Sequence, residues 1–179
     1  MSLKRFSVLI SGTICLLIAC TLFGCSGGES ADSGSSSNAT TENAKEANNV
    51  FNIGDYTAEF TKAEIGEDAG GEPALLVHYK FTNNSKDSQS FIWAFTNKAF
   101  PNGGQLDTAT VWKSEGSFDT VSDSTFSDIQ PGISLDVCET YVLQDTTTPV
   151  TVEVTGLLSD KKKSFEINPA ELDEFTPGA

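Results

Sequence analysis

Apolar and polar residues alternate along most of the chain after residue 50, most clearly on either side of one polar loop. Large apolar side chains occupy every second position over residues 75–82, and a second such row occupies residues 91–95. Residues 82–90 between them are polar and turn-forming. The pattern predicts two amphipathic strands that pack their apolar faces together. Their predicted inward-facing residues are Leu75, Val77, Tyr79, Phe81, Phe91, Trp93 and Phe95.

Further strands are predicted along the rest of the chain, each bounded by turn-forming residues. The apolar row of the segment that begins at Ile133 is interrupted by Glu139, whereas Val150, Val152 and Val154 alternate cleanly with polar residues. The predicted strands cover residues 56–65, 133–143, 150–154 and 161–167.

Two parts of the chain give weaker signals. Residues 105–113 are compatible with another strand, and the polar residues 114–128 indicate either a long loop or a weak edge strand. Asn168, followed by Pro169 and then by an acidic residue, is typical of the start of a helix and predicts a single helical turn. The residues after Phe175 are expected to form a loose tail.

About seven short strands without a long helical period predict one all-β domain. The expected fold is an antiparallel, immunoglobulin-like β-sandwich over residues 50–170, followed by a C-terminal tail over residues 171–179. About 120 residues is an ordinary size for such a domain.

The N-terminus has the layout of an exported protein. Lys4 and Arg5 precede a largely apolar run over residues 6–23, which is the arrangement of a secretory signal peptide. The run ends in Leu22, Phe23, Gly24 and Cys25, which resembles the lipobox of bacterial lipoproteins. The resemblance implies cleavage after residue 24 and attachment of diacylglycerol to the Cys25 sulfur.

This layout predicts an extracytoplasmic domain anchored to a bacterial cell membrane through lipidated Cys25. Two alternatives are an uncleaved anchor helix, since the apolar run approaches spanning length, and a soluble secreted product. Residues 26–49 contain no large apolar side chain, so together with Cys25 they are expected to form a flexible linker over residues 25–49.

Charge narrows the range of partners. The 179-residue chain has a formal net charge of −14, and removal of the signal would leave 9 basic against 25 acidic residues, with no arginine. Nucleic-acid binding is not expected, because it needs a basic surface that displaces counterions from phosphates. Strong acidity instead favours cationic partners or metal ions.

Residues suited to catalysis are scarce. Only Cys138 lies in the predicted domain among the four cysteines, so no internal disulfide is expected, and a buried structural thiol is the simpler interpretation. His78 is the single histidine, whereas hydrolytic triads and zinc sites need histidine together with suitable partners. We expect no enzymatic activity.

Two sets of residues are candidates for ligand binding. Asp119, Asp123 and Asp128 lie in one polar segment and could offer oxygen ligands to calcium, although their spacing fits no known calcium loop. Trp112 and Phe100 could form an aromatic contact surface near loops. The alternative for the aspartates is a solvated acidic loop, and the alternative for the aromatic residues is ordinary packing. No other cofactor is expected.

Several short motifs occur together in one order. They are Lys-Phe-Thr-Asn-Asn-Ser at residues 80–85, Lys-Ala-Phe-Pro-Asn-Gly at 98–103, Gln-Pro-Gly at 130–132, and the segments 141–145 and 149–154. Together they resemble family 5067 of the domains of unknown function, which is related to telokin-like, immunoglobulin-type sandwiches on bacterial lipoproteins. The resemblance covers most of residues 53–167 and implies a fold and a location, but no activity.

These observations predict a non-enzymatic, membrane-anchored binding or interaction module. Its contact surface is expected in the region of residues 100–128, because loops on a rigid scaffold usually carry recognition. The expected partner is an envelope protein or a wall component. The alternative is a lipoprotein that binds calcium or a small solute for an envelope system.

Overall fold

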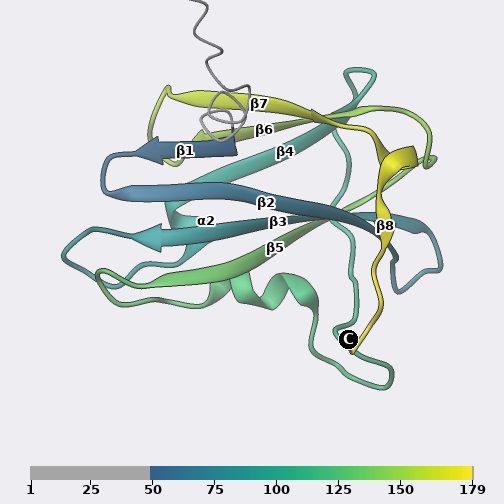
Figure 1. Cartoon of the computed structure of the whole chain (residues 1–179), viewed down its shortest axis with the longest axis horizontal. Helices are drawn as coiled ribbons and strands as arrows, with labels where there is room; N and C mark the ends of the chain where they lie inside the picture. The colour runs from purple at the N-terminus through teal and green to yellow at the C-terminus, as the bar shows by residue number, and fades with distance from the viewer. Residues whose placement is uncertain (1–48, 179) are drawn as a thin grey trace, which may run out of the picture. The chain divides into compact units, whose positions relative to one another are not determined.

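A computed structural model describes residues 49–178 of the chain. The predicted signal peptide, the lipobox and almost all of the predicted linker therefore lie outside the described residues. Two β-sheets form the described part, and they confirm the predicted antiparallel β-sandwich (Figure 1). Its strands are β1 (Val50–Ile53), β2 (Tyr56–Glu67), β3 (Pro73–Asn83), β4 (Phe95–Pro101), β5 (Ser134–Val142), β6 (Val150–Gly156), β7 (Lys162–Ile167) and the two-residue β8 (Asp173–Glu174).

The larger sheet has the strand order β1-β2-β3-β5, with β8 paired to β2. All pairs are antiparallel except the short β2–β8 pair. A register shift between Phe60 and Lys62 leaves Thr61 as an extra residue in β2, and the Thr61 hydroxyl donates to the His78 carbonyl at 3.1 Å. Because β5 is the last strand in this order, it forms one edge of the sheet.

The smaller sheet has the order β4-β6-β7, so β4 is one of its edges. The predicted alternation in β6 is confirmed, because Val150, Val152 and Val154 are buried and their neighbours are less so. A turn follows β4, with Asn102 and Gly103 both at positive φ.

The main core lies between the two sheets. It contains the inward row of β3 and the valines of β6, and aromatic rings make up much of its volume. Tyr79 stacks on Phe91 with ring centroids 5.5 Å apart, and Phe60 of β2 contacts Phe165 of β7 at 4.7 Å. Offset and edge-on contacts of this kind stabilise the core beyond the area they bury.

The outer face of the larger sheet is also covered. Ala74 and Leu76 of β3 are fully buried against Ala109, Val111 and Val121. The segment that supplies Ala109 and Val111 first pairs briefly with β5, where Thr108 bridges Tyr141, and the apolar side chains of this segment and of η1 cover the outer face. This explains why apolar residues occupy both faces of β3, whereas a strand exposed on one face would alternate.

The predicted strand over residues 91–95 is wrong in its first half. Residues Phe91–Ala94 form a single helical turn, α2, and β4 begins only at Phe95. Phe91 is buried at 0% exposure but Trp93 is 63% exposed, so Trp93 is not a core residue. A helical turn places residues two apart on opposite sides, which removes Trp93 from the row of Phe91.

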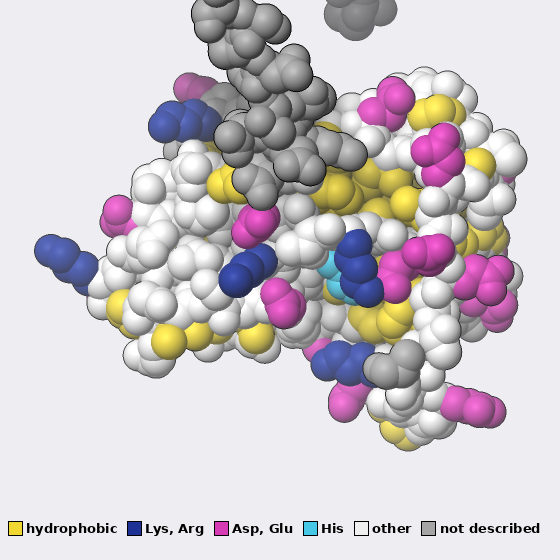
Figure 2. Space-filling view, viewed as in Figure 1, with side chains coloured by type: hydrophobic (Ala, Val, Ile, Leu, Met, Phe, Trp, Pro, Cys, Tyr) yellow, Lys and Arg dark blue, Asp and Glu magenta, His cyan; other side chains and the backbone are white. Residues whose placement is uncertain are grey.

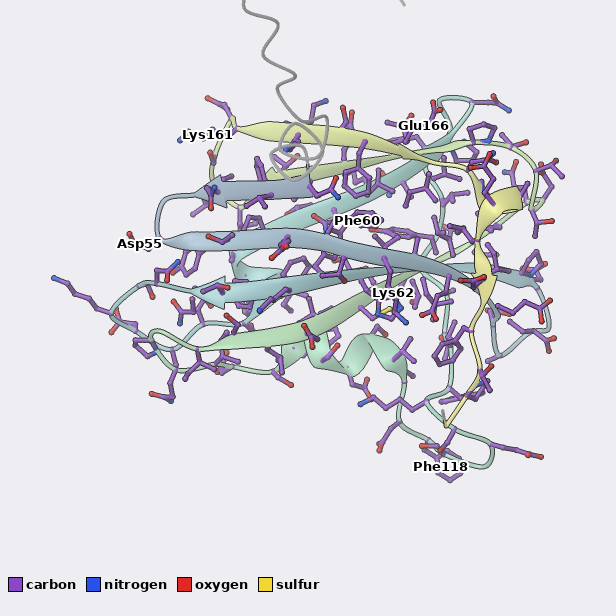
Figure 3. The ribbon with its side chains drawn as sticks, in the orientation of Figure 1. Asp55, Phe60, Lys62, Phe118, Lys161 and Glu166 are labelled. Carbon is purple, nitrogen blue, oxygen red and sulfur yellow. The ribbon has the colours of Figure 1, made fainter. Side chains whose placement is uncertain are left out.

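The segment from residue 105 to 128 also differs from the predicted strand. Thr108 and Trp112 make isolated bridges to Tyr141 and Thr120, and Val121–Phe126 forms a 3₁₀ helix, η1. The loop before η1 projects from the domain, with Phe118 at its tip (Figure 3). The predicted loop is therefore confirmed only for part of residues 114–128.

The C-terminal residues pack onto the domain. The predicted helical turn is confirmed as a 3₁₀ turn, η2 (Pro169–Glu171), and the Asn168 side chain accepts a hydrogen bond from Ala170 N. Beyond it, β8 pairs with β2 and Phe175 N donates to Ile65 O at 2.7 Å. Residues 171–175 thus belong to the sandwich and not to a tail. Within residues 49–178, no helix is long and apolar enough to cross a membrane.

Candidate functional site

The open side of the sandwich between β4 and β5 carries polar residues where the core pattern calls for apolar ones. The inward row of β4 is Phe95, Asn97 and Ala99, and the inward row of β5 contains Glu139 between Val137 and Tyr141. Each edge strand therefore has one polar side chain in its inward row. These two strands belong to different sheets, and Asn97 and Glu139 line the same cavity between them.

Asn97 and Glu139 line one cavity of about 210 Å³, which we call the Glu139 pocket. Strand β5 supplies its carboxylate, β4 its amide, and α2 and η1 cover it from outside. The remaining lining residues are Ile92 of α2; Thr108, which lies before η1; Ser122, Thr125 and Phe126 of η1; and Thr140 and Tyr141 of β5. Of these, Phe126 is 64% exposed and stands at the rim.

The Glu139 carboxylate is weakly stabilised in its charged form. Burial raises the pKa of Glu139 above its ordinary value, while the Tyr141 hydroxyl and the nearby Asn97 amide lower it to a lesser extent. Tyr141 Oη donates to Glu139 Oε2 at 2.7 Å. Burial and the neighbouring carboxylate raise the pKa of Tyr141 well above 10, so this phenol remains a neutral donor.

Other polar atoms at this place have no hydrogen-bond partner among residues 49–178. They are Asn97 Nδ2, Asn97 Oδ1 and Tyr79 Oη, all of them buried. Asn97 lies close enough to Glu139 to lower its pKa, although no hydrogen bond of standard geometry joins the two side chains. Buried polar atoms without partners each cost about 1–3 kcal/mol, so they are uncommon unless water or a ligand satisfies them.

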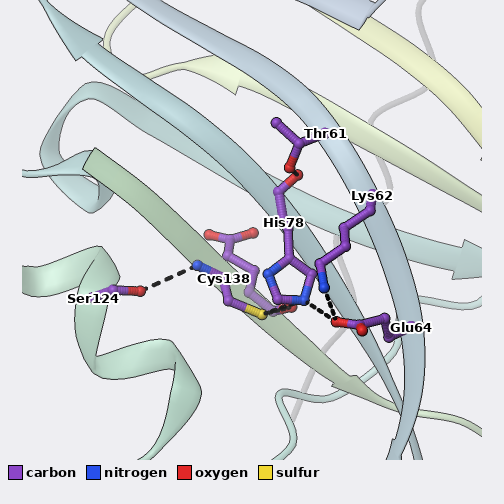
Figure 4. Close-up of polar contacts among 7 residues, drawn as sticks. Thr61, Lys62, Glu64, His78, Ser124 and Cys138 are labelled. Carbon is purple, nitrogen blue, oxygen red and sulfur yellow. Dashed lines mark hydrogen bonds and ion pairs between the residues drawn. The ribbon is translucent and has the colours of Figure 1, made fainter. Parts of the chain in front are cut away.

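A second polar cluster lies on the outer face of the larger sheet (Figure 4). Glu64 Oε2 lies 2.8 Å from His78 Nε2 and 2.9 Å from Lys62 Nζ, although neither contact has hydrogen-bond angles. His78 Nε2 also lies 3.7 Å from Cys138 Sγ. Burial lowers the pKa of His78, more than the nearby Glu64 carboxylate raises it.

This cluster lacks the arrangement of a nucleophilic relay. In such a relay the nucleophile and the orienting acid contact opposite nitrogens of the imidazole, whereas Cys138 and Glu64 both approach Nε2. Burial, with Glu139 and Glu64 nearby, raises the pKa of Cys138 to about 12, which keeps the sulfur as a thiol. The structure thus gives Cys138 the environment of a buried packing residue.

The aromatic candidates from the sequence lie at separate places. Trp112 is 37% exposed and lines a groove of about 430 Å³ with Phe175 and Glu67. Phe100 lines a different groove of about 600 Å³ with Pro149 and Glu166. Because these grooves share no lining residue, the structure does not combine Trp112 and Phe100 into one aromatic surface.

The three aspartates proposed for calcium are not gathered either. Within residues 49–178, no group of three or more histidine, cysteine or acidic side chains could hold a metal ion. Asp123 instead caps η1, because its two carboxylate oxygens accept hydrogen bonds from Thr120 N at 2.8 Å and Thr120 Oγ1 at 2.7 Å. Asp119 and Asp128 lie outside this cap, and acidic residues are spread over the face shown in Figure 2.

The Glu139 pocket was not predicted as a site. Its signal in the sequence was the charged residue that interrupts the apolar row of residues 133–143. Asn97 gave no comparable signal, because the predicted strand over 91–95 ended before it. Only the packing of the two sheets shows that these two residues line one cavity.

The fold places the chain among small β-sandwich domains. The family described as Domain of unknown function (DUF5067) matches residues 30–156, and the chain belongs to that family. The resemblance noted from the short motifs is thereby confirmed. No curated protein matches the chain.

Three solved structures share the fold. A candidate lipoprotein from Staphylococcus aureus is 12% identical with a TM-score of 0.53, over 71% of this chain and 98% of that one. An uncharacterised β-sandwich protein from Clostridium difficile is 15% identical with a TM-score of 0.51, over 68% and 91%. A protein from Enterococcus faecalis is 21% identical with a TM-score of 0.50, over 68% and 90%. At these identities the likeness concerns the fold alone.

Proposed function

We propose that the chain is a lipid-anchored, extracytoplasmic binding protein that captures a small polar ligand in the Glu139 pocket. The observation that carries the proposal is the Asn97 amide, whose two polar atoms are buried beside a carboxylate and have no partner within residues 49–178. A stable core position would ordinarily be apolar, as it is at Phe95 and Ala99 on the same strand.

The surroundings of the pocket support binding and not turnover. Its one acidic side chain has no second carboxylate, histidine or cysteine among the residues that line the cavity. Acid–base catalysis on a bound molecule usually needs a pair of groups with different pKa values. We therefore assign the pocket a recognition role.

The anchor part of the proposal rests on the sequence. The signal-peptide layout and the lipobox ending in Cys25 support export and lipidation. Such an anchor would hold the pocket outside the membrane, where an envelope protein, a wall component or a free solute could present the ligand. Four residues of the pocket come from the segment 100–128 that the sequence analysis favoured for contacts.

Chemical-shift mapping by NMR tests the pocket. The ¹⁵N-labelled full chain in detergent is titrated with a panel of small amines, carboxylates, amides and sugars. We expect at least one class to shift the amide signals of residues around Asn97 and Glu139 in a saturable manner. A matched variant, Thr108→Trp, places a large side chain at an exposed lining position and should abolish the shifts without unfolding the domain. Shifts that persist in this variant, or no saturable shift with any class, would contradict the proposal.

A further inference from the structure

We propose that the Glu139 pocket binds a primary ammonium group carried on a short apolar chain. This inference rests on the pocket being the binding site proposed above and adds the chemical class of its ligand. Four properties of the cavity support this ligand class independently: its charge, its hydrogen-bond capacity, its size and the residues of its walls.

The charge of the lining selects a cation. Glu139 is the only acidic residue of the lining, and the lining includes no lysine, arginine or histidine. Among the described residues, its carboxylate receives one well-formed hydrogen bond, from Tyr141, and no ion pair. A bound ammonium would supply the opposite charge that the protein leaves out, and the net charge of −14 attracts cations over longer distances.

The hydrogen-bond capacity of the pocket also fits an ammonium. This group offers three donors and no acceptor. The Glu139 carboxylate and Asn97 Oδ1 are acceptors, and Asn97 Oδ1 has no donor within residues 49–178. The hydroxyls of Thr125 and Thr140 already donate to Ser122 O and Ala109 O, so their free lone pairs can only accept.

The size and walls of the cavity define the rest of the ligand. A volume of about 210 Å³ is below the range of about 300–1,000 Å³ for pockets that enclose drug-sized molecules. It has room for about seven waters at roughly 30 Å³ each, and so for a short chain. Ile92 and the exposed ring of Phe126 form an apolar side near the rim, where methylene groups would lie.

Other ligand classes fit less well. An anion would face the Glu139 carboxylate with no basic residue of the lining to hold it. Calcium takes six to eight oxygen ligands, and the described residues contain no cluster of three or more acidic or histidine side chains. A neutral alcohol of the same length would leave the carboxylate without a counter-charge.

Three probes of equal chain length separate these classes. Butylammonium, butyrate and n-butanol are titrated into the full chain in detergent by isothermal calorimetry at constant ionic strength. We expect the Kd of butylammonium to be at least about tenfold lower than that of either other probe, which corresponds to about 1.4 kcal/mol. Glu139→Gln should raise the Kd of butylammonium at least tenfold.

A matched control removes the same charge outside the pocket. Asp136 lies on β5 three residues before Glu139 and is exposed, so Asp136→Asn should leave the Kd within about twofold. The melting transition of each variant is recorded to confirm that it is folded. A Kd for butylammonium that is unchanged in Glu139→Gln would place the amine elsewhere and overturn the inference.

The pH dependence gives a second measure. Binding needs ionised Glu139, so affinity should rise as the pH rises through the elevated pKa of this residue and then level off. The titratable groups facing it are Tyr141 of the same strand and Tyr79 of β3, and both have pKa values raised well above 10. Cys138, the neighbouring residue on β5, has its pKa raised to about 12, so these three groups stay neutral over this range.

The outcomes separate the two levels of the proposal. Tighter binding of butanol or butyrate, blocked by Thr108→Trp, would overturn the ammonium class and leave the pocket as a binding site. If none of the three probes binds but a sugar or an amide causes a saturable NMR shift, the ammonium class is likewise overturned and the pocket remains a binding site. If no ligand class binds in either experiment and only ordered water contacts Asn97, both the binding site and the ammonium class are overturned.

Discussion

Asn97 and Glu139 hold corresponding places on the two edge strands that flank one open side of the sandwich. Each lies in an inward row between apolar residues, Asn97 on β4 of the smaller sheet and Glu139 on β5 of the larger one. Each of these polar side chains lowers the stability of the core relative to an apolar residue, and both do so at the same place. Stability alone would favour apolar replacements at both positions, and this is the observation that supports the ligand site proposed above.

Replacing Glu139 with glutamine should stabilise the protein at neutral pH. Burial raises the pKa of Glu139 in the folded state above its ordinary value of 4.5. The folded state therefore binds the proton more tightly than the unfolded state, and the free energy of unfolding falls as the pH rises between the two pKa values. Glutamine has no charge to bury and can still accept from Tyr141. We expect the melting temperature at pH 7 to rise by roughly 2–4 °C for about 1 kcal/mol.

The pH profile of the same variant checks the cause. The difference in melting temperature between Glu139→Gln and the unchanged protein should be smallest near pH 4 and largest at pH 7 to 8. A difference that is constant with pH would mean that the gain comes from packing and not from the charge.

The sequence allowed much of the fold to be predicted, because alternation alone identifies strands with one buried face. Val150, Val152 and Val154 are an example, and the helical turn at Pro169 followed from its capping residues. Phe91 and Trp93 misled the prediction, because two apolar residues two apart are compatible with a strand or with a turn of helix. Contacts from distant segments decided between them, and the sequence does not show those contacts.

The site was harder to predict than the fold. Trp112, Phe100 and the aspartates were chosen for their residue types, yet the structure distributes them over different grooves and one helix cap. Glu139 was visible as an irregularity in a strand. Its importance depends on Asn97, which lies 42 positions earlier and is brought near it only by the packing of two sheets.

His78 should make stability depend on pH below the ordinary histidine pKa of 6.5. Burial lowers its pKa below the ordinary value of 6.5, so the unfolded state binds the proton more tightly. The free energy of unfolding should fall as the pH drops from 6.5 towards the lowered pKa, by at most about 1.4 kcal/mol per pH unit. Urea unfolding of the unchanged protein and of His78→Gln measures this directly. The difference between the two profiles should lose its slope above pH 7, and an equal slope in both would assign the effect to another group.

Gly156 should tolerate no side chain. It pairs with Phe95 in the smaller sheet, and the Ile53 side chain fills the space that a Cβ would occupy. Gly156→Ala would push Ile53 out of its place, which should cost about 1–3 kcal/mol of stability in chemical unfolding. Gly104→Ala is the matched control, because a Cβ there meets only Pro101 O at 4.0 Å. Equal losses in the two variants would contradict the assignment.

Phe175 should attach the C-terminal residues to the larger sheet. Its backbone N–H donates to Ile65 O at 2.7 Å, and its side chain packs near Gly66 and the apolar residues that cover the outer face of the larger sheet. Phe175→Ala should lower the free energy of unfolding by about 1–3 kcal/mol, whereas exposed Thr176→Ala should change it by less than about 0.5. Proteolysis near residue 172 should also become faster in Phe175→Ala. Unchanged stability would show that the residues after η2 contribute nothing to the fold.

Cys25 should carry the lipid that keeps the domain at the membrane. A diacylglyceryl group supplies two acyl chains, which anchor stably where one chain would not. Metabolic labelling with an alkyne fatty acid should mark the unchanged protein and Cys20→Ala, whose replaced thiol lies in the signal peptide, but not Cys25→Ala. Mass spectrometry should find the labelled N-terminus at Cys25. An unlabelled chain that retains residues 1–24 would instead make the apolar run an anchor helix, and an unlabelled chain cut before the domain would make the protein a secreted one.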